Sequence, residues 1–315
     1  MAVTRETFRV PSGDGVHSLF CVLYRPAGQP IGLFQLVHGM TEYIDRYAPL
    51  MEAAAEAGLV CFGHNHLGHK DTAGDDELGY IAEKGGDRLL VEDVHAVGEE
   101  MRRAYPGLPH VLFGHSMGSF VARLAAERYG EEYASCVFCG SGSAPAGALL
   151  GQGVLRALAT LRGDHAVSGL AYRLAFGGYR RRCKDEPSPN AWVTSDPEQL
   201  ARYDSDPYCT FRFTLSAMGD LVRLNRRANR GAWFAHMRRD LPILMVSGDD
   251  DPVGGWGKGV TRVAERLRNA GCTVELKLYP GMRHEILNER GREEPARDIL
   301  DFVLRHVRAE KAEQA

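Results

Sequence analysis

The sequence predicts an α/β protein with a mostly parallel central sheet, helices on both faces of the sheet and an inserted, mainly helical cap. Short apolar runs alternate with amphipathic helical patterns along most of the chain, and such alternation is typical of a parallel sheet covered by helices. The alternation stops after residue 143 and resumes near residue 241. We therefore expect a core of residues 1–140 and 241–315 and a cap of residues 141–240. A chain of 315 residues is long enough for one core with such an insertion.

The core elements follow one another in the order that this fold class requires. Two apolar stretches around a Gly-Asp-Gly turn, residues 7–12 and 18–25, predict a β-hairpin. Beyond it, apolar runs that end near glycines predict strands, and a periodicity of 3.6 residues predicts helices. The further strands are expected at residues 32–39, 59–65, 110–116, 134–143, 241–248 and 273–281, and the helices at residues 46–57, 89–105, 117–130, 259–271 and 293–308.

The composition excludes several classes of protein. With 44% hydrophobic and 25% charged residues the chain has the average composition of globular proteins, and no run approaches the roughly 20 apolar residues of a membrane span. The polar N-terminus lacks the apolar core of a signal peptide, so we expect a cytoplasmic protein. The net charge of −3 argues against a general affinity for nucleic acid.

The cysteines favour reduced thiols over a disulfide framework. There are seven of them, an odd number, and they are scattered along the chain. Cys136 and Cys139 form the single Cys-x-x-Cys pattern. They lie three residues apart in a predicted strand, where side chains point to opposite faces, so we expect that they share neither a metal ion nor a bridge.

A candidate nucleophile lies between a predicted strand and a predicted helix. Residues 114–118, Gly-His-Ser-Met-Gly, have the pattern Gly-x-Ser-x-Gly. A tight strand-to-helix turn exposes such a serine at the edge of a sheet, and the two glycines allow the close backbone contacts of the turn. The pattern alone also occurs in ordinary glycine-rich turns. Its position between a strand and a helix favours a catalytic role for Ser116.

The chain also supplies partners for this serine. A serine hydroxyl needs a general base, and the base needs an acid that orients it. The strand at 241–248 is followed by Asp249–Asp251, and the strand at 273–281 is followed by His284. Ser, Asp and His therefore occur in that order, each just beyond the C-terminal end of a strand. We expect them to meet at one edge of the sheet.

Four segments carry a resemblance to a known family. HGMTEYIDRY, GHSMGS, SGDDDPVG and YPGMRHE are similar to the motifs of the monoacylglycerol lipase and lysophospholipase branch of the α/β-hydrolase superfamily, close to the serine aminopeptidase-type hydrolases. The similarity covers the two core segments. It implies the α/β-hydrolase fold, an acyl-enzyme mechanism and no cofactor. It also implies that the acid lies four residues after Ser247, at Asp251, and leaves Asp249 and Asp250 as solvated or capping carboxylates.

The resemblance implies further site residues. The amides of Met40, which follows the His-Gly turn, and of Met117, which follows the nucleophile, are expected to bind the oxyanion. The family pattern HGxxEHxxRY is matched at the Glu, Arg and Tyr positions, while Tyr43 stands where the family usually has His. An i, i+4 Glu–Arg pair is also common on exposed helices. The residues expected to bind the polar head of a substrate are Glu42, Arg46 and His115.

Three histidines within six residues raise the question of a metal site. His64, His66 and His69 have the His-x-His-x-x-His spacing found in metal-dependent hydrolases. Such an enzyme would have Asp at position 68, where this chain has Gly68, and no further ligands follow in order. The segment instead resembles a loop of the family, NDHLGHGxS. We therefore predict no metal.

The cap segment differs from the core in charge. Residues 141–240 contain 15 Lys and Arg against 9 Asp and Glu. The basic run Arg180–Arg182 and the Ala/Leu-rich stretch 144–161 predict transient contact with a membrane or micelle surface, and the stretch also suits an apolar wall for an acyl chain. Ordinary helix packing explains the stretch equally well, and a solvated face explains the arginines.

These residues together predict a serine hydrolase that cleaves carboxylic esters of lipid-like substrates, monoacylglycerol or lysophospholipid, without nucleic-acid partners. A general carboxylesterase and an amidase or aminopeptidase are the alternatives within the same fold. A peptidase needs a carboxylate for the substrate amine, for which Asp204 and Asp206 are candidates in an otherwise basic cap. A non-catalytic hydrolase-like binding protein would lack a member of the triad. The oligomeric state is not predicted.

Overall fold

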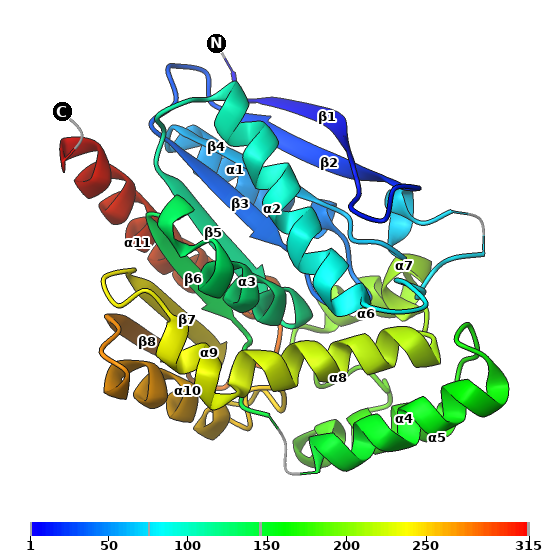
Figure 1. Cartoon of the computed structure of the whole chain (residues 1–315). Helices are drawn as coiled ribbons and strands as arrows, with labels where there is room; N and C mark the ends of the chain where they lie inside the picture. Colours follow the sequence, from blue (N-terminus) through cyan, green and yellow to red (C-terminus); the bar gives the residue numbers. More distant parts are fainter. Residues whose placement is uncertain (1, 75, 145–146, 314–315) are drawn as a thin grey trace.

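The computed structural model describes residues 2–74, 76–144 and 147–313, and an eight-stranded sheet forms its centre (Figure 1). The strand order across the sheet is β1-β2-β4-β3-β5-β6-β7-β8. β2 pairs antiparallel with both of its neighbours, β1 and β4, and all pairs from β4 to β8 are parallel. The strands are β1 (Thr4–Pro11), β2 (Ser18–Arg25), β3 (Gly32–Val37), β4 (Leu59–His64), β5 (His110–His115), β6 (Ser135–Cys139), β7 (Ile243–Gly248) and β8 (Val274–Tyr279).

Helices cover both faces of the sheet, as the alternating pattern predicts. The helices that follow the core strands are α1 (Ala48–Glu56), α2 (Gly86–Ala104), α3 (Met117–Arg128), α10 (Lys258–Asn269) and α11 (Glu293–Glu313). The predicted helix at 46–57 is divided into a 3₁₀ turn, Ile44–Tyr47, and α1. Pro49 explains the new start, because proline is tolerated in the first helical turn, where N–H groups have no intrahelical acceptor.

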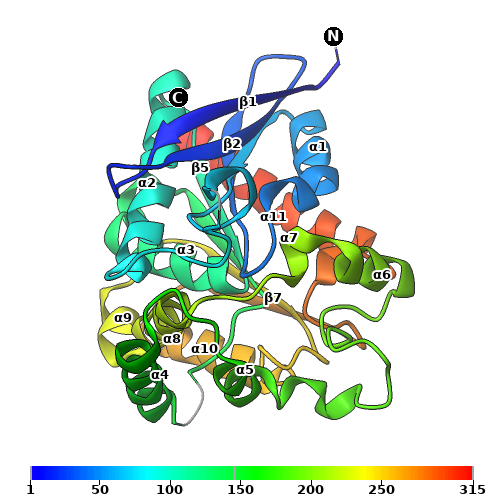
Figure 2. The same cartoon turned by 90° about the vertical axis from the view of Figure 1, so that its right-hand side faces the viewer.

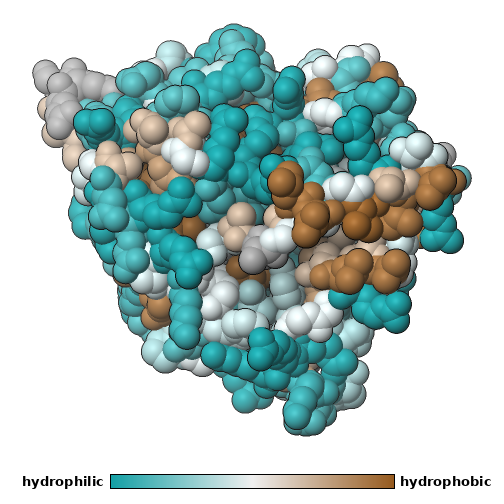
Figure 3. Space-filling model, turned by 60° about the horizontal axis from the view of Figure 1, so that its bottom comes forward, coloured by the Kyte–Doolittle hydropathy of each residue, from teal (hydrophilic) through white to brown (hydrophobic). Residues whose placement is uncertain are grey.

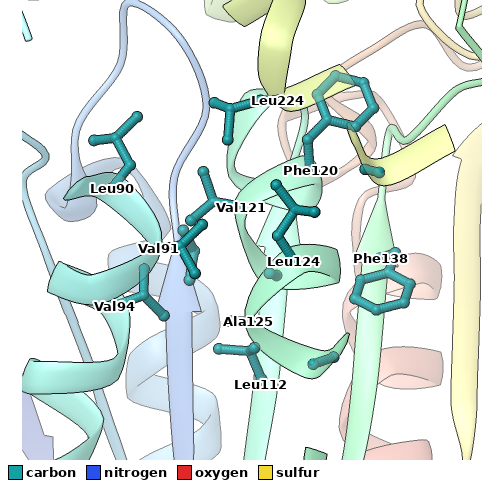
Figure 4. Packing of buried hydrophobic residues seen from close by; sticks show 14 of the residues in the cluster. Leu90, Val91, Val94, Leu112, Phe120, Val121, Leu124, Ala125, Phe138 and Leu224 are labelled. Carbon is teal, nitrogen blue, oxygen red and sulfur yellow. The ribbon is translucent and has the colours of Figure 1, made fainter. Parts of the chain in front are cut away.

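Two apolar cores lie on the opposite faces of the sheet. One contains buried residues of α2, α3 and α10, and the other contains those of α1 and α11. Figure 4 shows the first core, where Leu90 and Val94 of α2 and Val121 and Leu124 of α3 lie over Leu112 of β5. The strands β3, β4 and β5 between these layers are buried along their whole length and are mostly apolar, as expected for parallel strands covered on both faces.

The predictions for the cysteines are confirmed. All seven thiols are free and buried. Cys136 belongs to the first core and Cys139 to the second, so the two side chains point to opposite faces of β6.

In the described part of the chain, no helix combines the length and the apolar run that crossing a bilayer requires.

The segment between β6 and β7 contains six helices among its described residues, and we call it the insertion. They are α4 (Ala148–Arg162), α5 (Gly169–Phe176), α6 (Pro197–Ser205), α7 (Pro207–Thr210), α8 (Leu215–Asn229) and α9 (Gly231–His236). Helices α4 and α5 lie at the end of the molecule opposite to the two termini (Figures 1 and 2). By contrast, α8 packs against α2 and α3 and contributes Leu224 to the first core. The last part of the insertion is therefore packed on the core helices.

A buried arginine of α3 joins α8 to the core. Arg123 is fully buried and donates to the carbonyl oxygen of Ala228 and the side chain of Asn229, at the C-terminal end of α8. Its guanidinium lies 4.2 Å from the ring of Trp233. Burial, and to a smaller extent the positive charge of Arg266, lower the pKa of Arg123 to about 9. The negative end of the α8 dipole and neutral oxygens hold this cation.

Candidate active site

Ser116 occupies a strained turn between β5 and α3. Its backbone has φ 53° and ψ −120°, a conformation that residues other than glycine rarely adopt. The two glycines of the motif are required by close backbone contacts. A Cβ atom on Gly114 would lie 2.4 Å from the carbonyl oxygen of Gly118, and one on Gly118 would lie 2.2 Å from that of Val37. The turn therefore has the geometry of a nucleophile elbow.

A hydrogen-bonded chain connects this serine to a histidine and an aspartate. Nε2 of His284 lies 2.8 Å from Oγ of Ser116, and Nδ1 of His284 lies 3.0 Å from Oδ1 of Asp251. The Asp251 carboxylate is fully buried and also accepts hydrogen bonds from the Ser247 hydroxyl and the Val253 amide. These contacts fix the carboxylate, so its bond to Nδ1 leaves Nε2 free to accept the serine proton.

Only one carboxylate of the triple aspartate faces the imidazole. Asp249 accepts a hydrogen bond from the amide of Gly281 at 2.7 Å. Asp250 forms an ion pair with Arg182 at 2.6 Å on the surface. Asp251 is the one that contacts His284. The structure therefore brings together the three residues that the sequence proposes as a triad.

The amides of Met40 and Met117 flank the nucleophile. A Cβ atom on Gly39 would lie 2.9 Å from Cβ of Ser116, so the turn that leads to Met40 packs directly against the serine. Met117 is the first residue of α3, where N–H groups have no intrahelical acceptor. Within residues 2–74, 76–144 and 147–313, neither amide is hydrogen bonded to another group of the protein. Both N–H groups are thus available to an oxyanion.

Glu42 is a buried carboxylate beneath the turn that leads to Met40. It accepts hydrogen bonds from the Gly39 amide at 2.5 Å, the Tyr47 hydroxyl at 3.0 Å and Nδ1 of His115 at 2.8 Å. Burial raises the pKa of Glu42, but the charges of His115 and Arg46 outweigh it and lower the pKa to about 2. The ionised carboxylate holds the backbone of this turn.

His115 and Arg46 are likewise engaged with protein groups. Burial lowers the pKa of His115, but Glu42 outweighs this effect and the pKa is raised. Nε2 of His115 lies 3.3 Å from the carbonyl oxygen of His284. A protonated His115 therefore donates one hydrogen bond to Glu42 and one to this carbonyl oxygen. Arg46 forms a bidentate pair with Glu285, with two contacts of 2.7 Å. Binding of a substrate head group by Glu42, Arg46 and His115 stays a prediction.

The three histidines of the metal-like spacing form a buried cluster with His38. All four are fully buried. His66 donates its backbone N–H to Nε2 of His38 and its own Nε2 lies 3.1 Å from the His38 carbonyl oxygen. Burial lowers the pKa of His64 to about 3 and that of His69 to about 4. Among the described residues no group of three or more Asp, Glu, His and Cys side chains is arranged to hold a metal ion.

Several residues around His284 were not found from the sequence. The ring of Trp192 lies 5.2 Å from the imidazole of His284, and Arg283 and Glu289 contact the same part of the insertion. Trp192 lies in a polar stretch rich in Pro, Ser and Asp, which shows neither strand nor helix periodicity. A lone tryptophan in a polar stretch was the one signal that the sequence offered there.

The chain is similar to known hydrolases in sequence and in fold. The family described as serine aminopeptidase, S33 (Hydrolase_4), matches residues 28–291. A monoacylglycerol lipase of Mycolicibacterium smegmatis is 28% identical over 96% of this chain and 99% of its own. The human monoglyceride lipase is 37% identical over 38% of each chain. The solved structure of a thermostable carboxyl esterase from Bacillus coagulans, in complex with glycerol, has a TM-score of 0.90 and 31% identity, covering 98% of this chain and 99% of that one.

The family matches more than half of the chain, and its fold is the one described above. The eight-stranded, mostly parallel sheet and the elbow between β5 and α3 are both present. The chain therefore belongs to the serine aminopeptidase S33 (Hydrolase_4) family of α/β-hydrolases, in the branch of the monoacylglycerol lipases.

Proposed function

We propose that this α/β-hydrolase is a serine esterase that cleaves carboxylic esters of lipid-like substrates, monoacylglycerols or lysophospholipids, through an acyl-enzyme intermediate. The observation that carries the proposal is the buried chain of hydrogen bonds from Ser116 through His284 to Asp251. It provides a nucleophile, a base and an orienting acid in contact.

The geometry supports a two-step reaction. His284 accepts the hydroxyl proton through Nε2 as Ser116 Oγ attacks the ester carbonyl. The oxyanion that forms accepts hydrogen bonds from the amides of Met40 and Met117. His284 then donates the proton to the leaving alcohol. Water then attacks the carbonyl of the acyl-enzyme while His284 accepts its proton, and His284 returns this proton to Oγ of Ser116 as the bond to the acyl group breaks and the carboxylic acid leaves. Asp251 stabilises the imidazolium in both steps.

The proposed substrate class rests on the relatives and on the surface. The names of the relatives are monoacylglycerol lipase, monoglyceride lipase and carboxyl esterase. In addition, α4 and α5 present apolar side chains to solvent, and Figure 3 shows the apolar area in brown on the face where these helices lie. An exposed apolar area of this kind fits a substrate that is dispersed in a membrane or micelle.

A hydrolysis screen tests the proposal. The wild-type protein and Ser116→Ala should be assayed on p-nitrophenyl esters of increasing acyl length, monoacylglycerols, lysophospholipids and aminoacyl p-nitroanilides. We expect Ser116-dependent hydrolysis of the esters and little hydrolysis of the anilides. Hydrolysis of the anilides alone would favour the peptidase alternative.

The two carboxylates that the sequence offers for a substrate amine, Asp204 and Asp206, already accept hydrogen bonds from protein groups. Asp206 accepts a hydrogen bond from the Tyr43 hydroxyl and caps α7 through the amide of Tyr208. Asp204 accepts a hydrogen bond from the side chain of Asn190. Each candidate therefore already has a protein donor, which weakens it as a site for a substrate amine.

We propose further that α4 and α5 contact a lipid surface. The exposed apolar residues of these helices and of the link between them are Leu149, Leu150, Val154, Leu161, Val167, Leu170 and Leu174. Leu150 and Leu161 are 78% and 81% exposed, so they contribute little to packing. Residues 145–146 of the Ala/Leu-rich stretch lie outside the described residues. The arginine run supports this role less, because Arg182 pairs with Asp250 and Arg180 donates to the carbonyl oxygen of Lys184.

The surface proposal has its own test. Leu150→Ser/Leu161→Ser should lower co-sedimentation with phosphatidylcholine vesicles and leave hydrolysis of a short soluble ester unchanged. Val16→Ser is the matched control, because Val16 is 83% exposed on the hairpin turn and lies far from α4 in the sequence. Unchanged binding of the double variant to vesicles would contradict the proposal, whereas replacement of Arg180–Arg182 by glutamine tests a contribution from anionic lipids.

A further inference from the structure

The loop that carries His284 is held by a short segment of the insertion. This segment is Ala191–Ser195, which precedes α6 and is nearly 100 residues away in the sequence. The amide of Glu285 donates to the carbonyl oxygen of Val193 at 2.8 Å. The hydroxyl of Thr194 donates to the carbonyl oxygen of Asn288 at 2.9 Å. The segment is thus bonded to two backbone groups of the histidine loop, both on the C-terminal side of His284.

Glu289 connects the residue before the histidine to the same segment. Its Oε1 accepts the amides of Arg283 and Ser195, both at 2.9 Å, and its Oε2 accepts the Ser195 hydroxyl at 2.6 Å. The carboxylate is 1% exposed. A buried carboxylate is costly unless hydrogen bonds satisfy it, and these three donors do so. They also fix the backbone directly before His284 to the insertion.

Arg283 adds a second connection of the same kind. Its guanidinium donates to the carbonyl oxygens of Ala191 and Thr194, at 2.5 and 3.3 Å, and pairs with Glu186 at 3.0 Å. All three partners belong to the insertion. The residues on both sides of His284 therefore contact the insertion, Arg283 through its side chain and Glu285 through its amide.

The insertion also reaches the imidazole itself. The ring of Trp192 lies 5.2 Å from that of His284, and the ring of Tyr179 lies 5.0 Å from that of Trp192. The ring of His115 lies 4.8 Å from that of His284. The imidazole thus has one ring neighbour from the core and one from the insertion. Its orientation toward Ser116 depends on both.

We propose that Glu289 is a positioning residue, and that with Ala191–Ser195 it fixes the general base, so that the insertion is part of the catalytic machinery and not only a cover. The inference rests on the proposed esterase function. It follows that loosening of the insertion at Ala191–Ser195 displaces His284 from Ser116 and slows the reaction without contact to the substrate. A displacement of about 1 Å at a reacting group costs on the order of 10²-fold in rate.

Glu289→Ala and Glu289→Gln test this inference on the full-length protein. With a soluble p-nitrophenyl ester, we expect Glu289→Ala to lower kcat by about 10- to 100-fold with KM within about twofold, because the carboxylate does not reach the substrate. Glutamine keeps the acceptor for both amides and donates to the Ser195 hydroxyl. Glu289→Gln should therefore recover most of the lost rate. The rate of Ser116 labelling by a fluorophosphonate should fall and recover in parallel.

A matched variant and a spectroscopic readout separate positioning from stability. Glu294→Gln changes an exposed glutamate of α11 that pairs with Lys277 at 2.9 Å, and we expect it to leave kcat unchanged. The downfield proton resonance of the His284 Nδ1–H bond to Asp251 should broaden or shift in Glu289→Ala and not in Glu294→Gln. If Glu289→Ala does not fold, Ser195→Ala is the alternative. It removes the hydroxyl that donates to Glu289, and it should lower kcat by a smaller factor.

The outcomes are distinct. If the wild-type protein is active, and Glu289→Ala or Ser195→Ala has the same kcat and the same proton resonance as the wild type, the positioning role is overturned. A loss of rate in Glu289→Ala that Glu289→Gln does not recover, with the resonance unchanged, would also overturn it. A wild-type protein that neither hydrolyses esters nor reacts with the fluorophosphonate would overturn the proposed function, and the inference with it.

Discussion

Oγ of Ser116 lies 2.8 Å from Nε2 of His284, although 168 residues separate them in the sequence. The contact arises because both residues follow the C-terminal ends of parallel strands, β5 and β8, of the same sheet. Asp251, beyond the end of β7, completes the hydrogen-bonded chain. Polar side chains that follow parallel strands of one sheet are thus brought together as a hydrogen-bonded serine, histidine and aspartate.

Substitution of the three aspartates should have unequal effects. Asp251→Asn should lower kcat by about 10⁴-fold, because an amide does not hold the imidazole in the tautomer that accepts the serine proton. Asp249→Asn and Asp250→Asn should change kcat little, since their partners are Gly281 and Arg182. Steady-state kinetics on one soluble ester compares the three. A crippling effect of Asp250→Asn with a mild effect of Asp251→Asn would contradict the assignment.

Gly140 should not tolerate a side chain. Its φ is +57°, and an added Cβ would lie 3.1 Å from Cε1 of His284 and 3.2 Å from Nε2 of His115. We expect Gly140→Ala to lower kcat by about 10-fold or more through displacement of the imidazole. Gly153→Ala in α4 is the control, because its Cβ would meet nothing within 4 Å, and it should leave kcat on a soluble ester unchanged. Equal rates for the two variants would contradict the prediction.

The buried histidines predict a loss of stability in acid. An unfolded imidazole binds a proton below about pH 6.5, whereas the pKa of folded His64 is lowered to about 3 and that of His69 to about 4 by burial. Between these values the unfolded chain binds more protons. The free energy of unfolding therefore decreases as the pH falls from 6.5 toward 4, by at most about 1.4 kcal/mol per pH unit for each histidine.

A single substitution isolates one of these protons. Neither ring nitrogen of His64 has a hydrogen-bond partner in the described part of the chain, so His64→Phe removes a titrating group without breaking a bond. Urea unfolding at pH 7.5, 6.5, 5.5 and 5.0 should show a weaker dependence on pH for His64→Phe than for the wild-type protein. Parallel curves for the two proteins would show that His64 is not neutral and buried.

Chelation should not affect catalysis. His38, His64, His66 and His69 contact one another and the backbone, and the described residues contain no arrangement of ligands for a metal. We expect incubation with EDTA, followed by removal of the chelator, to leave ester hydrolysis unchanged. Loss of activity that zinc restores would contradict this prediction and would indicate a metal site at His64, His66 and His69.

The sheet was predictable from the sequence because each element has its own periodicity. The apolar runs of β3 to β7 and the amphipathic pattern of α2 and α10 are local signals. Ser116 and His284 were predictable because they follow predicted strands, whereas the choice of Asp251 among three adjacent aspartates rested on the resemblance to the family. Alternation of strands and helices also implies that polar residues after parallel strands meet at one edge.

The support of the triad was not predictable, because it consists of contacts between distant segments. The pairing of Arg46 with Glu285 joins residues 239 positions apart, and a sequence shows neither partner of such a pair. Glu42 fits an ordinary helical pair with Arg46, yet it is buried and holds the amide of Gly39. The contacts of Ala191–Ser195 depend on the irregular backbone of the insertion, which has no periodicity to interpret.

The reaction of Ser116 with a fluorophosphonate probe, measured beside ester hydrolysis in the wild-type protein and in Ser116→Ala, tests the central claim most directly. The account predicts that the wild-type protein is labelled at Ser116 and hydrolyses a p-nitrophenyl ester. It also predicts that Ser116→Ala, folded with the same circular dichroism spectrum, loses both activities. Ester hydrolysis retained by Ser116→Ala at the wild-type rate would contradict the assignment of Ser116 as the nucleophile.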